Sequence, residues 1–223
     1  MYIVKPLPPQ VDKALLDLLV KAEPATIGHF LHTGFMNVNI KSLQRDVRVA
    51  GTAVTARAPG PDGSISGYAL GQIRPGDILI IDRCGDTKHA IIGGAAVYAA
   101  KKAGCAGIIV DGVVTDLGEL RAYGLPVWCH GATAITGKAL GLGGEFCIPV
   151  SCGGVAVSPG DVILADENGV LVLPPEPDLI KESAERAIGL QTAEKTTLAR
   201  VDRGEKMPDI NGVTELVMKN LRA

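Results

Sequence analysis

The segment from Gly107 to Asp116, with the sequence GIIVDGVVTD, constrains the fold of this chain more than any other segment. Residues 108–110 form a continuous apolar run, which is typical of a strand buried on both faces of a parallel sheet. The run ends at Asp111, and Asp116 follows shortly after it. Because α/β folds bind ligands at the carboxyl ends of their strands, both carboxylates are candidates for a functional site. The structural alternative is that Asp116 caps a short helix that begins at Leu117.

An apolar run that ends at an acidic residue occurs twice more, each time after a Pro-Gly-Asp turn, over residues 75–82 and 159–166. The pattern also predicts strands over 47–58, 127–130, 150–157 and 169–173, and helices over 25–31, 90–103 and 117–123. Only 4% of the residues are aromatic, so we expect a core of Ala, Val, Ile and Leu. Helices alternate with strands, but many steps join strand directly to strand. This pattern predicts a layered β/β/α fold rather than a doubly wound Rossmann sheet.

We expect a single domain over residues 1–223. A helix is predicted over residues 10–22, where apolar residues recur at helical spacing. From about residue 177 the chain is charged and predicts a peripheral helical tail, with helices over 179–197 and 209–221.

Composition and glycine spacing argue against several classes of protein. The net charge is −2 with acids and bases interspersed, so we expect no basic face for nucleic acid. Neither a GxGxxG loop after a strand nor a GxxxxGK[ST] loop is present, which argues against dinucleotide or P-loop nucleotide binding. No apolar run reaches the ~18 residues of a membrane span. Five cysteines without CxxC spacing are typical of a reducing compartment. We therefore expect a cytoplasmic protein without nucleic-acid or membrane partners.

The stretch Gly93-Gly94-Ala95-Ala96 lies at or near a helix start. A glycine pair there leaves backbone N–H groups open to a ligand, and the helix dipole favours an anion such as a carboxylate. The alternative is close packing of small residues between a helix and a sheet.

The order of these motifs resembles the RraA-like family, which includes the regulator of ribonuclease activity A and class II 4-hydroxy-4-methyl-2-oxoglutarate aldolases. The resemblance extends over about residues 24–175. It is carried by the segments Val49–Thr55, Pro75–Asp82, Ala103–Gly107, Asp111–Asp116, Gly124–Val127, Pro149–Gly154 and Pro159–Val170.

The resemblance implies a swivelling-domain-like β/β/α fold that assembles as a homotrimer or hexamer, with a site for a small oxo-acid in the cleft between subunits. In the aldolases of the family, an Asp-Gly-x-x-Arg-Asp motif ends in an Asp that holds Mg²⁺ or Mn²⁺. Carried over, Asp116 is the metal residue, and Gly93, Gly94, Ala95 and Ala96 are the loop whose amides bind the substrate. Thr115 stands at the position of the Arg that binds the carboxylate.

This chain departs from the aldolase pattern at three positions. Thr115 has no charged bidentate group, Gly94 replaces a common acid, and His29 replaces a common Asp. The resemblance still implies a metal-dependent lyase, by aldol cleavage or β-keto acid decarboxylation through a pyruvate enolate, with an altered substrate. The alternative is a non-catalytic regulator of the same fold.

Four other polar residues outside these motif positions could bear on the site. Lys88, His89 and Arg121 are candidates for a replacement positive charge. We interpret His130 as a hydrogen-bonded histidine at the end of a strand rather than a base.

Overall fold

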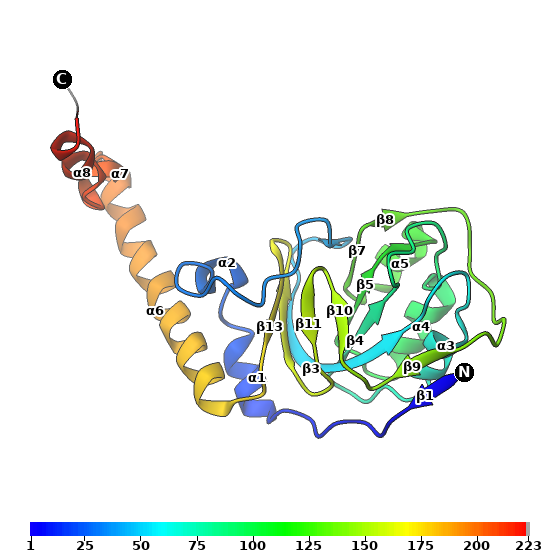
Figure 1. Ribbon diagram of the computed structural model, residues 1–223. Helices are drawn as coiled ribbons and strands as arrows, with labels where there is room; N and C mark the ends of the chain where they lie inside the picture. The colour runs from blue at the N-terminus through cyan, green and yellow to red at the C-terminus, as the bar shows by residue number, and fades with distance from the viewer. Residues whose placement is uncertain (222–223) are drawn as a thin grey trace.

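A mixed sheet forms the centre of the molecule (Figure 1). The structure is a computed structural model that describes residues 1–221. Within that range the sheet has nine strands, with the order β1-β9-β3-β4-β5-β7-β2 and with β12 joined to β3 and β13. These strands are β1 (Tyr2–Val4), β2 (Lys41–Ser42), β3 (Arg48–Arg57), β4 (Asp77–Asp82), β5 (Gly107–Asp111), β7 (Val127–Cys129), β9 (Gly144–Phe146), β12 (Val162–Asp166) and β13 (Gly169–Leu173).

Two small strand pairs and the helices surround this sheet. The pairs are β6 (Val113–Val114) with β8 (Gly131–Ala132), and β10 (Val150–Cys152) with β11 (Val155–Val157). The helices are α1 (Lys13–Leu19), α2 (Pro24–Ile27), α3 (Ser64–Leu70), α4 (Gly94–Lys102), α5 (Leu117–Tyr123), α6 (Pro177–Asp202), α7 (Met207–Ile210) and α8 (Val213–Lys219). Among residues 1–221, no helix is long and apolar enough to span a membrane.

The parallel strands β3, β4 and β5 are covered on both faces, as their continuous apolar sequences predict. On one face, Leu79 and Val110 belong to a core that includes residues of α3, α4 and α5. On the other face, Ile80 and Ile109 pack with residues of β10, β11 and β12. The predicted layered β/β/α fold is therefore confirmed.

A third core cluster joins α1, α2 and α6 to β12 and β13. Only the first half of α6 takes part, through Ile180, Ala184 and Ala187. Figure 1 shows the rest of α6 extending away from the sheet, with α7 and α8 at its far end. No residue of α7 or of α8 is buried.

Several predicted elements differ in the structure, and the helix predicted over 209–221 is divided into α7 and α8. The helix predicted over 90–103 begins only at Gly94, because Ala90 forms an isolated β-bridge with Thr136. The predicted strand over 150–157 is a hairpin instead. Gly153 and Gly154 have φ angles of 56° and 77°, and consecutive positive φ angles form a tight turn between antiparallel strands.

Candidate functional site

Asp116 binds the N-terminus of a neighbouring helix rather than capping its own. It precedes α5 in the left-handed conformation, with φ 58° and ψ 42°, and its side chain makes no capping hydrogen bond. Instead, the backbone N–H of Gly94 donates to Asp116 Oδ2 at 2.9 Å. Asp116 therefore occupies the N-cap position of α5, as the structural alternative predicts, but its carboxylate caps α4 instead of α5. A non-glycine residue in this conformation is strained, which is common at functional positions.

Gly93 leaves the space that the Asp116 side chain occupies. A Cβ on Gly93 would lie 2.5 Å from Asp116 Oδ2 and 2.7 Å from Thr115 Cγ2, which is closer than real contacts allow. Glycine is therefore needed at residue 93 for Asp116 to take this position.

Gly94 leaves space for a second carboxylate. A Cβ on Gly94 would lie only 1.6 Å from Oε2 of Glu119, so the Glu119 side chain fills the volume that a side chain at residue 94 would need. The aldolase resemblance placed an acid at residue 94. In this chain a carboxylate reaches the same place from α5, and nothing in the spacing of the sequence indicated it.

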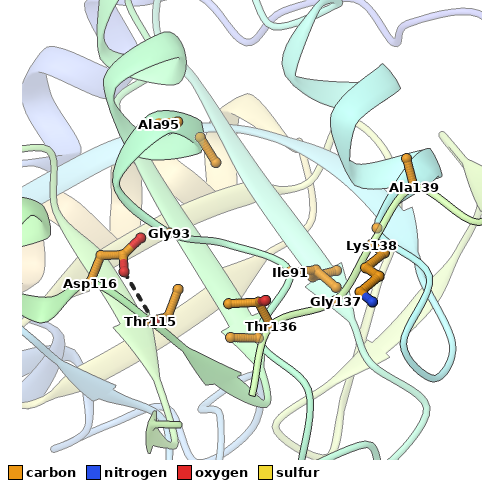
Figure 2. Close-up of a pocket in the computed structure, with 12 residues that line it drawn as sticks. Ile91, Gly93, Ala95, Thr115, Asp116, Thr136, Gly137, Lys138 and Ala139 are labelled. Carbon is orange, nitrogen blue, oxygen red and sulfur yellow. Dashed lines mark hydrogen bonds between the residues drawn. The ribbon is translucent and has the colours of Figure 1, made fainter. Parts of the chain in front are cut away.

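A pocket of about 320 Å³ opens beside Asp116 (Figure 2). Its lining is formed by Gly63, Ala90, Ile91, Gly93, Ala95, Ala96, Thr115, Asp116, Thr136, Gly137, Lys138 and Ala139. Of the predicted site residues, all but Gly94 are part of this lining, and Gly94 is buried at the helix start. The dashed line in Figure 2 marks the contact of Thr115 Oγ1 with Asp116 Oδ1, at 3.2 Å.

Lys138 is the cationic residue among the described lining residues, and no pattern in the sequence indicated a role for it. It lies in an irregular segment between β8 and β9, without periodicity or a motif. The candidates Lys88, His89 and Arg121 are not part of the lining. His89 Nδ1 instead contacts Asp86 Oδ2 at 2.8 Å.

A second group of charges follows the parallel strands but is closed by internal contacts. Arg57 Nε pairs with Asp82 Oδ2 at 3.1 Å, and His130 Nε2 pairs with Asp111 Oδ1 at 2.9 Å. The N–H of Gly153 donates to Asp111 Oδ2 at 3.0 Å. Asp111 therefore fastens the β10–β11 hairpin to the sheet and does not line the pocket. The interpretation of His130 as a hydrogen-bonded edge residue agrees with this contact.

Asp116 offers a fitting but minimal ligand for a divalent cation. The residue is exposed, and among its recorded partners only the Thr115 hydroxyl contacts Oδ1. Among residues 1–221 no group of three or more His, Cys, Asp or Glu side chains could hold a metal ion. One or two carboxylates suit Mg²⁺, which keeps several waters and takes further oxygens from the substrate.

Comparison with known proteins shows that the chain belongs to the RraA-like family, described as Aldolase/RraA, which it matches over residues 20–172. A 4-hydroxy-4-methyl-2-oxoglutarate aldolase of Thermus thermophilus is 34% identical over 141 residues, which cover 63% of this chain and 85% of that protein. A Halalkalibacterium halodurans protein with a provisional name of the same aldolase is 38% identical over 135 residues. That match covers 60% of this chain and 64% of the relative, less than two thirds of its length.

A solved structure with a different description shares the fold. Streptomyces coelicolor RraAS2, described as an unusual member of the RNase ES inhibitor RraA protein family, superposes with a TM-score of 0.74 at 26% identity. The superposition covers 85% of this chain and 99% of that one. Proteins similar to this chain thus include both a named aldolase and a member of an inhibitor family.

Proposed function

We propose that this protein is a divalent-metal-dependent carbon–carbon lyase that acts on a small oxo-acid, by retro-aldol cleavage or by decarboxylation of a β-keto acid. The observation that supports it most is Asp116, whose side chain is exposed in the wall of the pocket and makes no capping bond to its own helix. Asp116 would hold Mg²⁺ or Mn²⁺. When bound, the cation would polarise the oxo group and stabilise the negative charge that develops as the carbon–carbon bond breaks.

The start of α4 would orient the substrate. The first N–H groups of a helix have no partner within the helix and favour an anion. The N–H of Gly94 is taken by Asp116, so the N–H groups of Ala95 and Ala96 remain for a substrate oxygen. Both residues line the pocket. This agrees with the amide loop that the family resemblance implied over residues 93–96.

The test is release of pyruvate from a panel of 4-hydroxy-2-oxo acids and from oxaloacetate. Each substrate is assayed with Mg²⁺, with Mn²⁺ and with chelator. We expect pyruvate release that requires the metal and returns when the metal is added back. Release that is unaffected by chelator, or none with any substrate, would contradict the proposal.

A non-catalytic regulator is the second candidate, and Thr115 is the observation that favours it. In a regulator without catalysis the residues of the site are free to vary, and here the motif Arg that binds the carboxylate is replaced by Thr115. The similarity to RraAS2 gives this candidate a defined test, which is inhibition of an RNase ES-type endoribonuclease by the purified protein. For either function the family resemblance supports a homotrimer or hexamer, which light scattering distinguishes from a monomer.

A further inference from the structure

Apart from two residues, the pocket is lined by uncharged groups. The two are Asp116 and Lys138, and the other ten lining residues are glycine, alanine, isoleucine or threonine. Figure 2 shows the two charged side chains in different parts of the wall, with Thr136 drawn between them. A pocket of about 320 Å³ is at the small end of the range for ligand sites. The ligand of this pocket is therefore a small molecule, and the pocket offers it one anionic and one cationic side chain.

The backbone beneath Lys138 is held firmly. The N–H of Lys138 donates to the carbonyl of Pro61 at 2.9 Å, and the carbonyl of Lys138 accepts from the N–H of Gly63 at 2.9 Å. Between these two partners lies Asp62, which is 1% exposed. Its carboxylate accepts from the N–H groups of Leu140 and Leu142 at 3.1 and 2.6 Å. Burial raises the pKa of Asp62, but the bonds from Ser64, Leu140 and Leu142 outweigh burial and hold that pKa well below its usual range.

The ammonium of Lys138, by contrast, is free to bind a ligand. Its side chain is exposed in the pocket wall, and within residues 1–221 its Nζ has neither an ion pair nor a hydrogen bond. Nearby cations are engaged elsewhere. Arg83 is fully buried and donates to the carbonyls of Ala58, Gly60 and His89. Arg57 pairs with Asp82 and Glu145.

We infer that Lys138 binds the carboxylate of the substrate, in place of the arginine that is absent at residue 115. The inference rests on the proposed function, because it takes the ligand to be an oxo-acid. An ammonium on a fixed backbone segment is a point charge that pairs with a carboxylate. Lys138 is the one cationic side chain of the described lining, so it is the side chain there that can pair with a carboxylate of the substrate.

The experiment compares Lys138→Gln and Lys138→Arg with the wild type, and uses Lys195→Gln, on the exposed part of α6, as a matched loss of one surface charge. Two quantities are measured in the full-length protein. The first is KM and kcat for pyruvate release from 4-hydroxy-2-oxopentanoate and from its dicarboxylate relative. The second is pyruvate binding by calorimetry, with and without Mg²⁺. Thermal melting confirms that each variant is folded.

We expect Lys138→Gln to raise KM for the monocarboxylate by about 10- to 100-fold and to weaken pyruvate binding similarly, because a hydrogen bond to a charged group is lost. Lys138→Arg should restore most of the affinity, and Lys195→Gln should behave as the wild type. Lys138→Gln with unchanged KM and binding would overturn the inference while leaving the lyase proposal intact. Pyruvate binding that depends on Lys138, in a protein without turnover, would support the inference and contradict the lyase proposal. A wild type that binds no oxo-acid would overturn both.

Discussion

Asp111 ends a buried strand and Asp116 follows it, and both carboxylates have a partner on each oxygen, but they differ in exposure and in whether a partner can carry a charge. Asp111 has a partner on each oxygen, His130 on Oδ1 and the N–H of Gly153 on Oδ2. Asp116 accepts from the N–H of Gly94 and the Thr115 hydroxyl, and is otherwise exposed in the wall of a pocket. A carboxylate that the fold has already paired stabilises the fold. A carboxylate that is exposed and has no cationic partner, on a strained backbone, is available to a ligand.

The cationic side chains divide in the same way. Arg57 pairs with Asp82 and Glu145, and these bonds hold the ends of three strands together. Burial lowers the pKa of Arg57, but the bonds to Asp82 and Glu145 outweigh burial and raise that pKa above its ordinary value. Lys138 has no such partner among the described residues and lies in the pocket wall. The difference predicts that substitutions in the first group change stability, whereas substitutions in the second change ligand binding and turnover.

The sharpest test of the difference between residues that stabilise the fold and residues that bind a ligand replaces one aspartate at a time. Asp116→Ala should lower metal-dependent pyruvate release by about 10³-fold or more, because the carboxylate that holds the cation is lost. Its melting temperature should fall only slightly, since Asp116 is exposed and the change removes one hydrogen bond, from the N–H of Gly94. The matched control is Asp111→Asn, which should keep its kcat per folded molecule. Unchanged turnover in Asp116→Ala, or an equal loss in both variants, would contradict the division.

A smaller but still large effect is expected when the missing charge is restored. The wild type should be weak on 4-hydroxy-4-methyl-2-oxoglutarate, because Thr115 cannot form the charge-assisted bidentate contact of an arginine. Thr115→Arg should raise kcat/KM on this dicarboxylate by roughly 10²-fold, the equivalent of a few kcal/mol. A wild type that is already as active as Thr115→Arg would show that Lys138 or another cation serves both carboxylates.

The space at residue 94 limits which further residues of the aldolase motif can be restored. Restoring an acid there as Gly94→Glu would place its Cβ where the Glu119 carboxylate now lies, at 1.6 Å from Oε2. The single variant must therefore push Glu119 out of its position. If a carboxylate is needed there, Glu119→Ala should impair the wild type, and Gly94→Glu, which then has room, should compensate for it.

The third prediction concerns stability rather than activity. Asp111→Asn should lower the free energy of unfolding by about 2 kcal/mol, because the charge opposite His130 is lost and the amide keeps only one acceptor oxygen for His130 and the N–H of Gly153. Chemical denaturation of the variant and the wild type at pH 7 measures the difference. His130→Gln tests the same contact from its other side, and the double variant should cost less than the sum of the two single ones. Additive costs would show that the two side chains are not coupled.

The sequence predicted the strands better than the site, for physical reasons that particular residues make clear. Continuous apolar runs before Asp82, Asp111 and Asp166 indicate buried strands by themselves, and each run is a strand in the structure. Asp116 was found because it follows such a run. Lys138 follows no periodic segment, and its position depends on buried Asp62, about eighty residues earlier, which holds the segment from 140 to 142. A contact of that separation leaves no local pattern.

The smallest predicted effect is a pH dependence of stability that comes from one paired acid, Asp86. Burial raises the pKa of Asp86, but the bonds from the His89 side chain and from the N–H groups of His89 and Lys88 outweigh burial and lower it to about 2. A carboxyl group whose pKa is lower in the folded state stabilises the protein above its unfolded pKa. That stability is lost as the pH falls from about 4 toward 2.

Between pH 7 and pH 3, Asp86 should therefore account for a loss of about 1 kcal/mol in the free energy of unfolding. Urea denaturation at pH 7, 5, 4 and 3 measures it, with Asp86→Asn as the variant that cannot titrate. The wild type should lose more stability over this range than Asp86→Asn does, by about that amount. Parallel curves for the two proteins would mean that the contact between His89 and Asp86 does not persist in solution.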